Sequence, residues 1–111
     1  MKDDQAFLHH IRDALREVRD FVEGTDYEDF LEDRMMQNAV VRSFEVVGEA
    51  ARRVSPEFCE AHADVPWRPM GDFRNKLIHD YFALDLEIIW KTATEDAPML
   101  LDQIEGLVED V

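Results

Sequence analysis

One stretch of the sequence places a guanidinium, an imidazole and a phenol within eight residues, and these groups can bind a phosphate and move a proton beside it. The stretch begins at Arg74 and ends at Tyr81, with His79 between them. Arginine holds two phosphate oxygens with a planar fork that stays charged. Histidine, with an unperturbed pKa of about 6.5, accepts and returns a proton near neutral pH. Arg74 and His79 are therefore the candidate catalytic residues.

These residue types suit cleavage of an RNA phosphodiester. A histidine could activate the 2′-hydroxyl and protonate the leaving oxygen, while an arginine stabilises the crowded phosphorus in the transition state, without a metal ion. Asn75, which follows the arginine directly, would orient His79 or a phosphate oxygen. Spacing alone leaves a structural alternative open, in which His79 and Tyr81 only form hydrogen bonds at a helix end.

The positions of these residues on a helix constrain how they can share a site. Asn75 and His79 are four apart and share a face, whereas Arg74 and His79 are five apart and about 140° out of line. A common site therefore needs Arg74 to reach round the helix, or the helix to end near His79. The residues after Asp80 lead into the next predicted helix cap, so we expect the helix to end close to Asp80.

Charge is distributed unevenly along this acidic chain. The formal net charge is −14, which argues against nonspecific binding of nucleic acid. Residues 34 to 54 carry four arginines against two glutamates, and residues 65 to 84 carry three basic against two acidic residues, so these two segments are net cationic. They predict a cationic face that could hold one phosphodiester, although ordinary scatter of surface charge is the alternative.

The first half of the chain is predicted to contain two long helices. Residues 4 to 23 have apolar side chains at alternating spacings of three and four, and Gly24 stops this helix because glycine accepts a positive φ. Thr25 or Asp26 caps a short helical segment. The second long helix spans about residues 34 to 54, where Gly48 permits the close approach of another helix.

The second half is predicted to contain two more long helices. Ser55, with a proline after it, begins a short helix through about His62. The run from Pro66 to Pro69 breaks the chain before the helix that carries the candidate site. Asp85 caps the last helix, and Pro98 should kink it.

Together these elements predict an all-α fold and a single domain. No alternating run of β-branched residues suggests a sheet, so we expect an up-and-down bundle of about four long helices with short connecting helices. The 111 residues fit one domain over residues 1–111. No apolar run is long enough to span a bilayer and no signal segment is recognisable, which predicts a cytoplasmic protein with no membrane association.

The eight-residue stretch is similar to a family signature. The pattern of Arg, four residues, His, one residue and Tyr resembles that of the HepT toxins, members of the HEPN superfamily of small helical ribonucleases, and Arg74, His79 and Tyr81 fill its three fixed positions. Phe73 stands where methionine is more usual, which leaves the chemistry intact. The likeness extends over most of the chain through three further features, which are the run Val47 to Ala51, the pair Pro66-Trp67, and Asn75.

The resemblance implies an activity, partners and a regulatory modification. It implies a metal-independent endoribonuclease toxin without a cofactor, formed as a homodimer in which Arg74 and His79 of both chains face one RNA. A single histidine per chain would then supply both a base and an acid. The family's partner is an MNT-type minimal nucleotidyltransferase antitoxin that adds AMP to the motif tyrosine. By this resemblance Tyr81 is the AMPylation site, and phosphates added beside Arg74 would repel RNA.

Two other functions stay open at this point. The chain could be a non-catalytic subunit that binds nucleotide or substrate for a minimal nucleotidyltransferase, or a structural helical adaptor. Glu49 has two equally weighted interpretations, because its carboxylate could pair structurally with an arginine or line the cleft. We expect no metal site, since neither His9 and His10 nor His62 with Cys59 have further ligands at suitable spacing.

Overall fold

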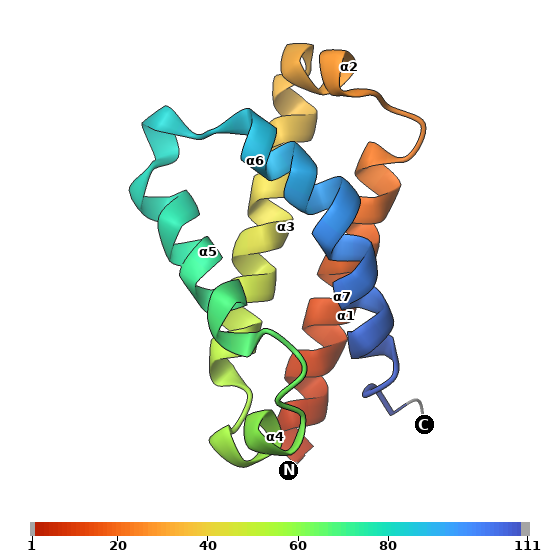
Figure 1. Cartoon of the computed structure of the whole chain (residues 1–111), viewed down its shortest axis with the longest axis vertical. Coiled ribbons are helices and arrows are strands. Elements are labelled where there is room, and N and C mark those ends of the chain that lie inside the picture. Colours follow the sequence, from red (N-terminus) through yellow and green to blue (C-terminus); the bar gives the residue numbers. More distant parts are fainter. Residues whose placement is uncertain (1, 110–111) are drawn as a thin grey trace.

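The chain folds as a series of helices that pack side by side (Figure 1). The computed structural model describes residues 2–109, apart from the side chains of Lys2 and Tyr81. Within this range there is no strand, which confirms the predicted all-α fold. The elements are α1 (Lys2–Val22), α2 (Tyr27–Glu32), α3 (Arg34–Arg53), α4 (Pro56–Ala61), α5 (Trp67–His79), the 3₁₀ turn η1 (Tyr81–Ala83), α6 (Leu86–Lys91), the π-helical η2 (Thr92–Asp96) and α7 (Ala97–Glu105).

Four long helical stretches make up the bundle, as predicted. They are α1, α3, α5 and the run from α6 through η2 to α7, which is helical without interruption. Helix α3 packs against α1 along one side and α5 along the other, while α7 packs on α1 (Figure 1). The largest fully buried side chains come from five of the helices and are Phe30, Leu8, Ile11, Leu15, Ile89, Ile104, Val18 and Val40.

The predicted caps begin the short helices and the last long one. Asp26 accepts a hydrogen bond from Asp29 N at 2.8 Å, and Ser55 Oγ accepts one from Phe58 N at 3.2 Å. Asp85 does the same for the first turn of α6. Gly24 has a φ of +77° just after α1, which is the conformation that a glycine stop requires. Local side-chain chemistry therefore sets these boundaries.

Pro69, predicted to break the chain, and Pro98, predicted to kink the last helix, both lie in the first turn of a helix. Pro69 lies inside the first turn of α5 rather than before it, because α5 begins at Trp67. The first turn of a helix has no intrahelical partner for its N–H groups, so a proline there sacrifices no hydrogen bond. Pro98 lies in the first turn of α7, and the helix accommodates it with the π-helical turn over Thr92–Asp96.

Gly48 allows α3 and α5 to approach closely, as predicted. A Cβ atom added at Gly48 would lie 2.2 Å from Arg74 Cβ and 2.7 Å from the Met70 carbonyl oxygen. No real Cβ fits there without a shift of one helix, so the absent side chain sets the distance between the two backbones. This contact also places the backbone of Arg74 directly against α3.

The two tryptophans anchor the core from half-buried positions. Trp90 packs against Phe30, with ring centroids 5.2 Å apart. Trp67 Nε1 donates a hydrogen bond to the His62 carbonyl at 2.9 Å while its ring packs against the core. Among the described residues, no helix combines the length and the apolar character needed to cross a membrane.

Candidate functional site

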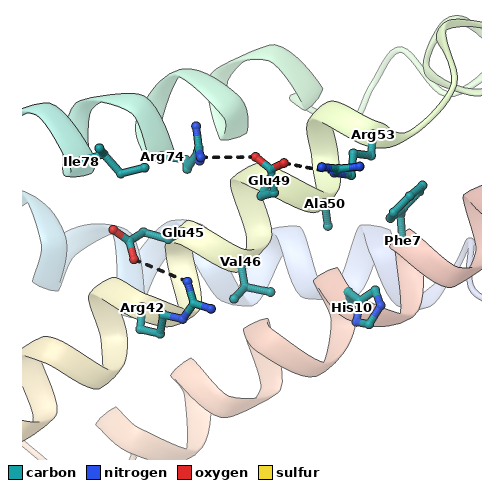
Figure 2. Close-up of a pocket in the computed structure, with 10 residues that line it drawn as sticks. All are labelled: Phe7, His10, Arg42, Glu45, Val46, Glu49, Ala50, Arg53, Arg74 and Ile78. Atoms are coloured by element: carbon teal, nitrogen blue, oxygen red, sulfur yellow. Dashed lines mark hydrogen bonds and ion pairs between the residues drawn. The ribbon is translucent and has the colours of Figure 1, made fainter.

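A pocket of about 340 Å³ opens where α1, α3 and α5 meet (Figure 2). Its floor is apolar and includes Phe7, Val46 and Ala50. Its polar lining is rich in arginine and consists of Arg42, Arg53 and Arg74, with His10, Glu45 and Glu49 beside them. The pocket therefore combines apolar contact area with several cationic groups, on a chain whose formal net charge is −14.

Arg74 lies at the centre of a chain of polar contacts between α5 and α3. Its Nη2 atom is 3.4 Å from Glu49 Oε2, and its Nη1 atom donates a hydrogen bond to Asn75 Oδ1 at 3.0 Å. The other carboxylate oxygen of Glu49 accepts a hydrogen bond from Arg53 Nε at 3.0 Å. One glutamate thus contacts two arginines, one on its own helix and one on the neighbouring helix (Figure 2).

The local sequence explains this arrangement. Glu49 and Arg53 are four residues apart on α3, which brings their side chains together on one face. Arg74 reaches the same carboxylate because Gly48 lets α5 approach α3 at the preceding residue. The hydrogen bond from Arg53, with the positive charges of Arg74, Arg53 and Arg52, lowers the pKa of Glu49 below its ordinary value. Glu49 is therefore a carboxylate at neutral pH.

The pocket unites basic residues from both cationic segments of the sequence. Arg42 and Arg53 belong to the segment 34–54, and Arg74 belongs to the segment 65–84. Arg42 is paired loosely, because its Nη1 atom is 3.9 Å from Glu45 Oε1 and its side chain is 76% exposed. The pocket thus brings together arginines of both segments, with Glu45 and Glu49 beside them, and the cationic face stays a prediction.

His79 lies apart from this pocket within the protomer. It is the last residue of α5 and is exposed, and Asp80 N donates to the Lys76 carbonyl at 2.9 Å as the helix ends. The predicted helix end near Asp80 is thus confirmed. Across the described residues, no hydrogen bond or ion pair to His79 is found, and Arg74 and His79 do not line a common pocket. Ile78, the residue before His79, does line the pocket that holds Arg74.

Of the two predicted supporting residues, Asn75 has a described side chain and Tyr81 does not. The amide oxygen of Asn75 accepts a hydrogen bond from Arg74 Nη1 at 3.0 Å, and its predicted role toward His79 or a phosphate stays a prediction. The side chain of Tyr81 lies outside what the structure describes. Its backbone begins the 3₁₀ turn Tyr81–Ala83 directly after Asp80.

Three residues of the pocket with basic side chains were not predicted from the sequence as site residues. Arg42 and Arg53 were visible only as part of the cationic segment, and that segment's charge was the signal that could have found them. His10 lies on the acidic helix α1, and only the packing of α1 against α3 brings it to the pocket. No cluster of three or more potential metal ligands is found within the described part of the chain.

Comparison with known proteins agrees with the motif. The sequence profile of the family described as Ribonuclease HepT-like matches residues 11–107. The chain belongs to this HepT-like family. It is 40% identical over 101 residues to a Thermococcus cleftensis protein named Probable ribonuclease HepT, covering 91% of this chain and 92% of the relative. No solved structure matches.

Two further relatives match across nearly the whole HepT-like chain. A Methanocaldococcus jannaschii protein named Putative RNase MJ0127 is 37% identical over 110 residues, covering 99% of this chain and 91% of the relative. A Caldanaerobacter subterraneus protein named Putative RNase TTE0752 is 37% identical over 109 residues, covering 98% and 97%. The family range 11–107 includes Arg74, His79 and Tyr81, so the family resemblance stated from these residues is confirmed.

Proposed function

We propose that this HepT-like chain is a metal-independent endoribonuclease that uses Arg74 and His79. The observation that carries the proposal is the position of Arg74, which lines a pocket where three arginines gather beside two glutamates on an otherwise acidic protein. An acidic surface repels RNA except where basic residues gather, so it restricts contact with the phosphates to that place. The relatives named as ribonucleases support the same activity.

The proposed reaction is an internal transesterification of RNA. His79 accepts the proton of a 2′-hydroxyl, whose oxygen attacks the adjacent phosphorus. Arg74 binds the non-bridging oxygens, where negative charge gathers in the transition state. The bond from phosphorus to the 5′ oxygen then breaks, and a second histidine protonates that oxygen. The products are a 2′,3′-cyclic phosphate and a 5′-hydroxyl, so no water or metal ion takes part in this step.

The second histidine is proposed to come from another copy of the chain. His79 ends an exposed helix and has no described partner in its own protomer, which suits a site completed by a homodimer. Exposed apolar residues flank it, since Ile78 is 43% exposed and Phe82 is 97% exposed. Apolar side chains of this size at one helix end are typical of a protein interface. His79 of one subunit would act as base while His79 of the partner subunit acts as acid.

A toxin role with control through Tyr81 completes the proposal. An MNT-type nucleotidyltransferase antitoxin would transfer AMP to the Tyr81 hydroxyl, forming a phosphodiester bond to the phenol oxygen and releasing pyrophosphate from ATP. Tyr81 follows the catalytic His79 by two residues. Added phosphates there would compete with RNA for the arginines and repel its backbone.

The activity is tested with purified protein and a mixed RNA substrate in EDTA. The wild type should cleave the RNA, whereas Arg74→Ala and His79→Ala should each lose at least about a hundredfold in rate, as expected for a transition-state ligand and a general base. His79→Ala that cleaves at the wild-type rate would refute the assignment. Tight nucleotide binding without any cleavage would instead support a non-catalytic partner of a nucleotidyltransferase.

The control mechanism is tested by mass spectrometry. Incubation with the partner nucleotidyltransferase and ATP should add the mass of one or more AMP units to the wild type and abolish cleavage. Tyr81→Phe should stay unmodified and active. A modified Tyr81→Phe protein would place the acceptor elsewhere.

A further inference from the structure

We infer that Glu49 is a positioning residue that fixes the guanidinium of Arg74 for catalysis. The inference rests on the proposed ribonuclease function, because it gives Arg74 a task that depends on orientation. An arginine side chain is long and has several rotatable bonds, so its fork meets a phosphate in the right plane only if neighbours restrict it. The neighbours found here are Glu49 and Asn75.

The geometry of Glu49 suits this task because its two oxygens are engaged separately. Arg53 Nε donates to Oε1 at 3.0 Å and so fixes the carboxylate from within α3. Oε2 then lies 3.4 Å from Arg74 Nη2 on α5. Asn75 Oδ1 accepts from the other terminal nitrogen, Nη1, at 3.0 Å. Arg74 is thus held at both terminal nitrogens, by acceptors on two different helices.

The backbone adds a third restraint on Arg74. The approach of α5 to Gly48 leaves no space for a Cβ atom, since Arg74 Cβ would be 2.2 Å away. The first carbon of the arginine side chain is therefore fixed against α3, one residue before Glu49. The stem is held at one end and the guanidinium at the other, which leaves little freedom between them.

The exposure of the pair indicates that its role is orientation rather than stability. The side chain of Glu49 is 39% exposed and that of Arg74 is 26% exposed. Ion pairs open to solvent at this level contribute little to folding stability. Removing the charge of Glu49 should therefore leave the fold intact, while releasing a guanidinium that the proposed reaction needs in one place.

Orientation and simple charge make opposite kinetic predictions. If Glu49 acted only through its charge, neutralising it would make the pocket more cationic, and RNA would bind more tightly without loss of turnover. If Glu49 positions Arg74, kcat falls while KM stays unchanged or decreases, because the contact that is lost strengthens only in the transition state. The changes in kcat and in KM, measured together, therefore distinguish a positioning role of Glu49 from a purely electrostatic one.

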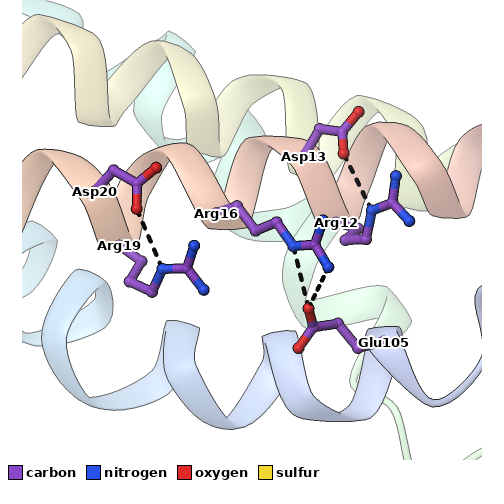
Figure 3. Close-up of polar contacts among 6 residues, drawn as sticks. All are labelled: Arg12, Asp13, Arg16, Arg19, Asp20 and Glu105. Atoms are coloured by element: carbon purple, nitrogen blue, oxygen red, sulfur yellow. Dashed lines mark hydrogen bonds and ion pairs between the residues drawn. The ribbon is translucent and has the colours of Figure 1, made fainter.

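The test compares Glu49→Gln with Glu105→Gln. Glu105 on α7 accepts two hydrogen bonds from Arg16 on α1, the shorter at 2.6 Å, so Glu105→Gln also neutralises an interhelical Arg–Glu pair (Figure 3). Neither residue of this pair lines the pocket that holds Arg74. Glu49→Gln should lower kcat about tenfold to a hundredfold, a loss typical of a misplaced catalytic group, without raising KM. Glu105→Gln should keep the kcat of the wild type, and both variants should keep its melting temperature.

A second measurement is independent of RNA cleavage. Phenylglyoxal modifies accessible guanidinium groups, and peptide mass mapping follows Arg74 alone. Modification of Arg74 should be faster in Glu49→Gln than in the wild type or in Glu105→Gln. An unchanged modification rate, or a Glu49→Gln variant with wild-type kcat, would overturn the positioning role. If the wild type itself fails to cleave RNA, the proposed function fails, whereas a rise in modification would still support the restraint on Arg74.

Discussion

At the scale of residues, the two proposed catalytic residues lie in different environments. Arg74 lies half-buried against α3 and is held by Glu49 and Asn75, whereas His79 is exposed at the end of the same helix. The motif and its helix end could be predicted from the sequence, because both depend on local spacing. The contact from Arg74 to Glu49 could not, since it depends on how closely α5 approaches α3.

Arg42 is the residue whose contribution to RNA binding is easiest to isolate. It lines the pocket with a side chain that is 76% exposed, and it lies near the middle of α3, well before Arg53 at the end of that helix. Arg42→Ala should weaken RNA binding several-fold and reduce the slope of log Kd against log salt by about 0.7, the value for one lost phosphate contact on a single strand. The measurement is a salt titration of RNA affinity by fluorescence anisotropy.

The matched control for this prediction is Arg19→Ala. Arg19 is also exposed and also lies beside a carboxylate, Asp20 (Figure 3), but it does not line the pocket. Its loss should leave the salt slope unchanged. Equal effects of the two substitutions would mean that RNA contacts are spread over the surface rather than gathered at the pocket.

At the scale of elements, most helix boundaries are set by local capping side chains. The structure differs from the sequence prediction at two prolines. Asp26, Ser55 and Asp85 cap the helices as the sequence predicts. The position of Pro69 inside the first turn of α5 was missed, because a proline is compatible both with a break and with a first turn. The π-helical turn before Pro98 was also missed, since the packing of the surrounding helix decides how the lost hydrogen bond is absorbed.

Gly48 is the point where a single methyl group should disturb both the fold and the site. In Gly48→Ala the added Cβ would overlap Arg74 Cβ and the Met70 carbonyl, so α5 has to move away from α3. We expect a loss of about 2 kcal/mol in the free energy of unfolding, typical of overpacking, together with reduced RNA cleavage. Urea denaturation measures the first effect and a cleavage assay the second.

Gly106→Ala is the corresponding control at a roomy position. The nearest atom to a Cβ there is the Gln103 carbonyl oxygen at 3.5 Å, and φ is −69°. This substitution should change stability by less than about 1 kcal/mol. If Gly48→Ala were as stable and as active as Gly106→Ala, α5 would be able to move away from α3 at little cost, which would contradict the prediction.

Asp4 ties the start of α1 to the junction between α3 and α4. It is 3% exposed, and it accepts hydrogen bonds from Ser55 N at 2.8 Å and Ser55 Oγ at 2.7 Å. Burial alone would raise the pKa of Asp4, but these hydrogen bonds outweigh it and bring the pKa below the ordinary value of 3.8. Asp4→Ala should therefore cost about 2 kcal/mol at neutral pH, as expected for buried partners left unpaired.

The direction of the pKa shift fixes how this cost depends on pH. A carboxyl group with a lowered pKa in the folded state stabilises the fold fully above its ordinary pKa and loses that contribution as the pH falls through the folded pKa. Urea denaturation should show a constant difference between wild type and Asp4→Ala down to about pH 4 and a shrinking one below it. Asp3→Ala, at an exposed neighbour, should show neither effect. A difference that grows in acid would contradict the assignment.

At the scale of the whole molecule, the cationic pocket and the exposed end of α5 suggest how two copies would meet. The uneven charge along the sequence predicted a cationic face, and the structure groups Arg42, Arg53 and Arg74 around one pocket. The surface of the proposed dimer could not be predicted from spacing or charge, because an interface depends on which apolar side chains stay exposed after folding. Ile78 and Phe82 are such residues.

A substitution at Ile78 tests the proposed dimer. Ile78→Glu puts a charge at an exposed apolar position beside His79, so it should convert the dimer to monomer in sedimentation experiments and abolish RNA cleavage. Met99→Glu is the matched control, because Met99 is 71% exposed on α7 and does not line the pocket that holds Arg74. It should leave both properties unchanged. A monomeric Ile78→Glu protein with full activity would show that one chain suffices.

The chemistry of the cleaved RNA ends tests the central claim most directly. Wild-type protein should be incubated with a synthetic RNA in EDTA, beside His79→Ala, and the fragments identified by mass. The account predicts fragments that end in a 2′,3′-cyclic phosphate and begin with a 5′-hydroxyl, formed by the wild type and not by His79→Ala. Fragments with 5′-phosphate and 3′-hydroxyl ends, or equal cleavage by both proteins, would contradict it.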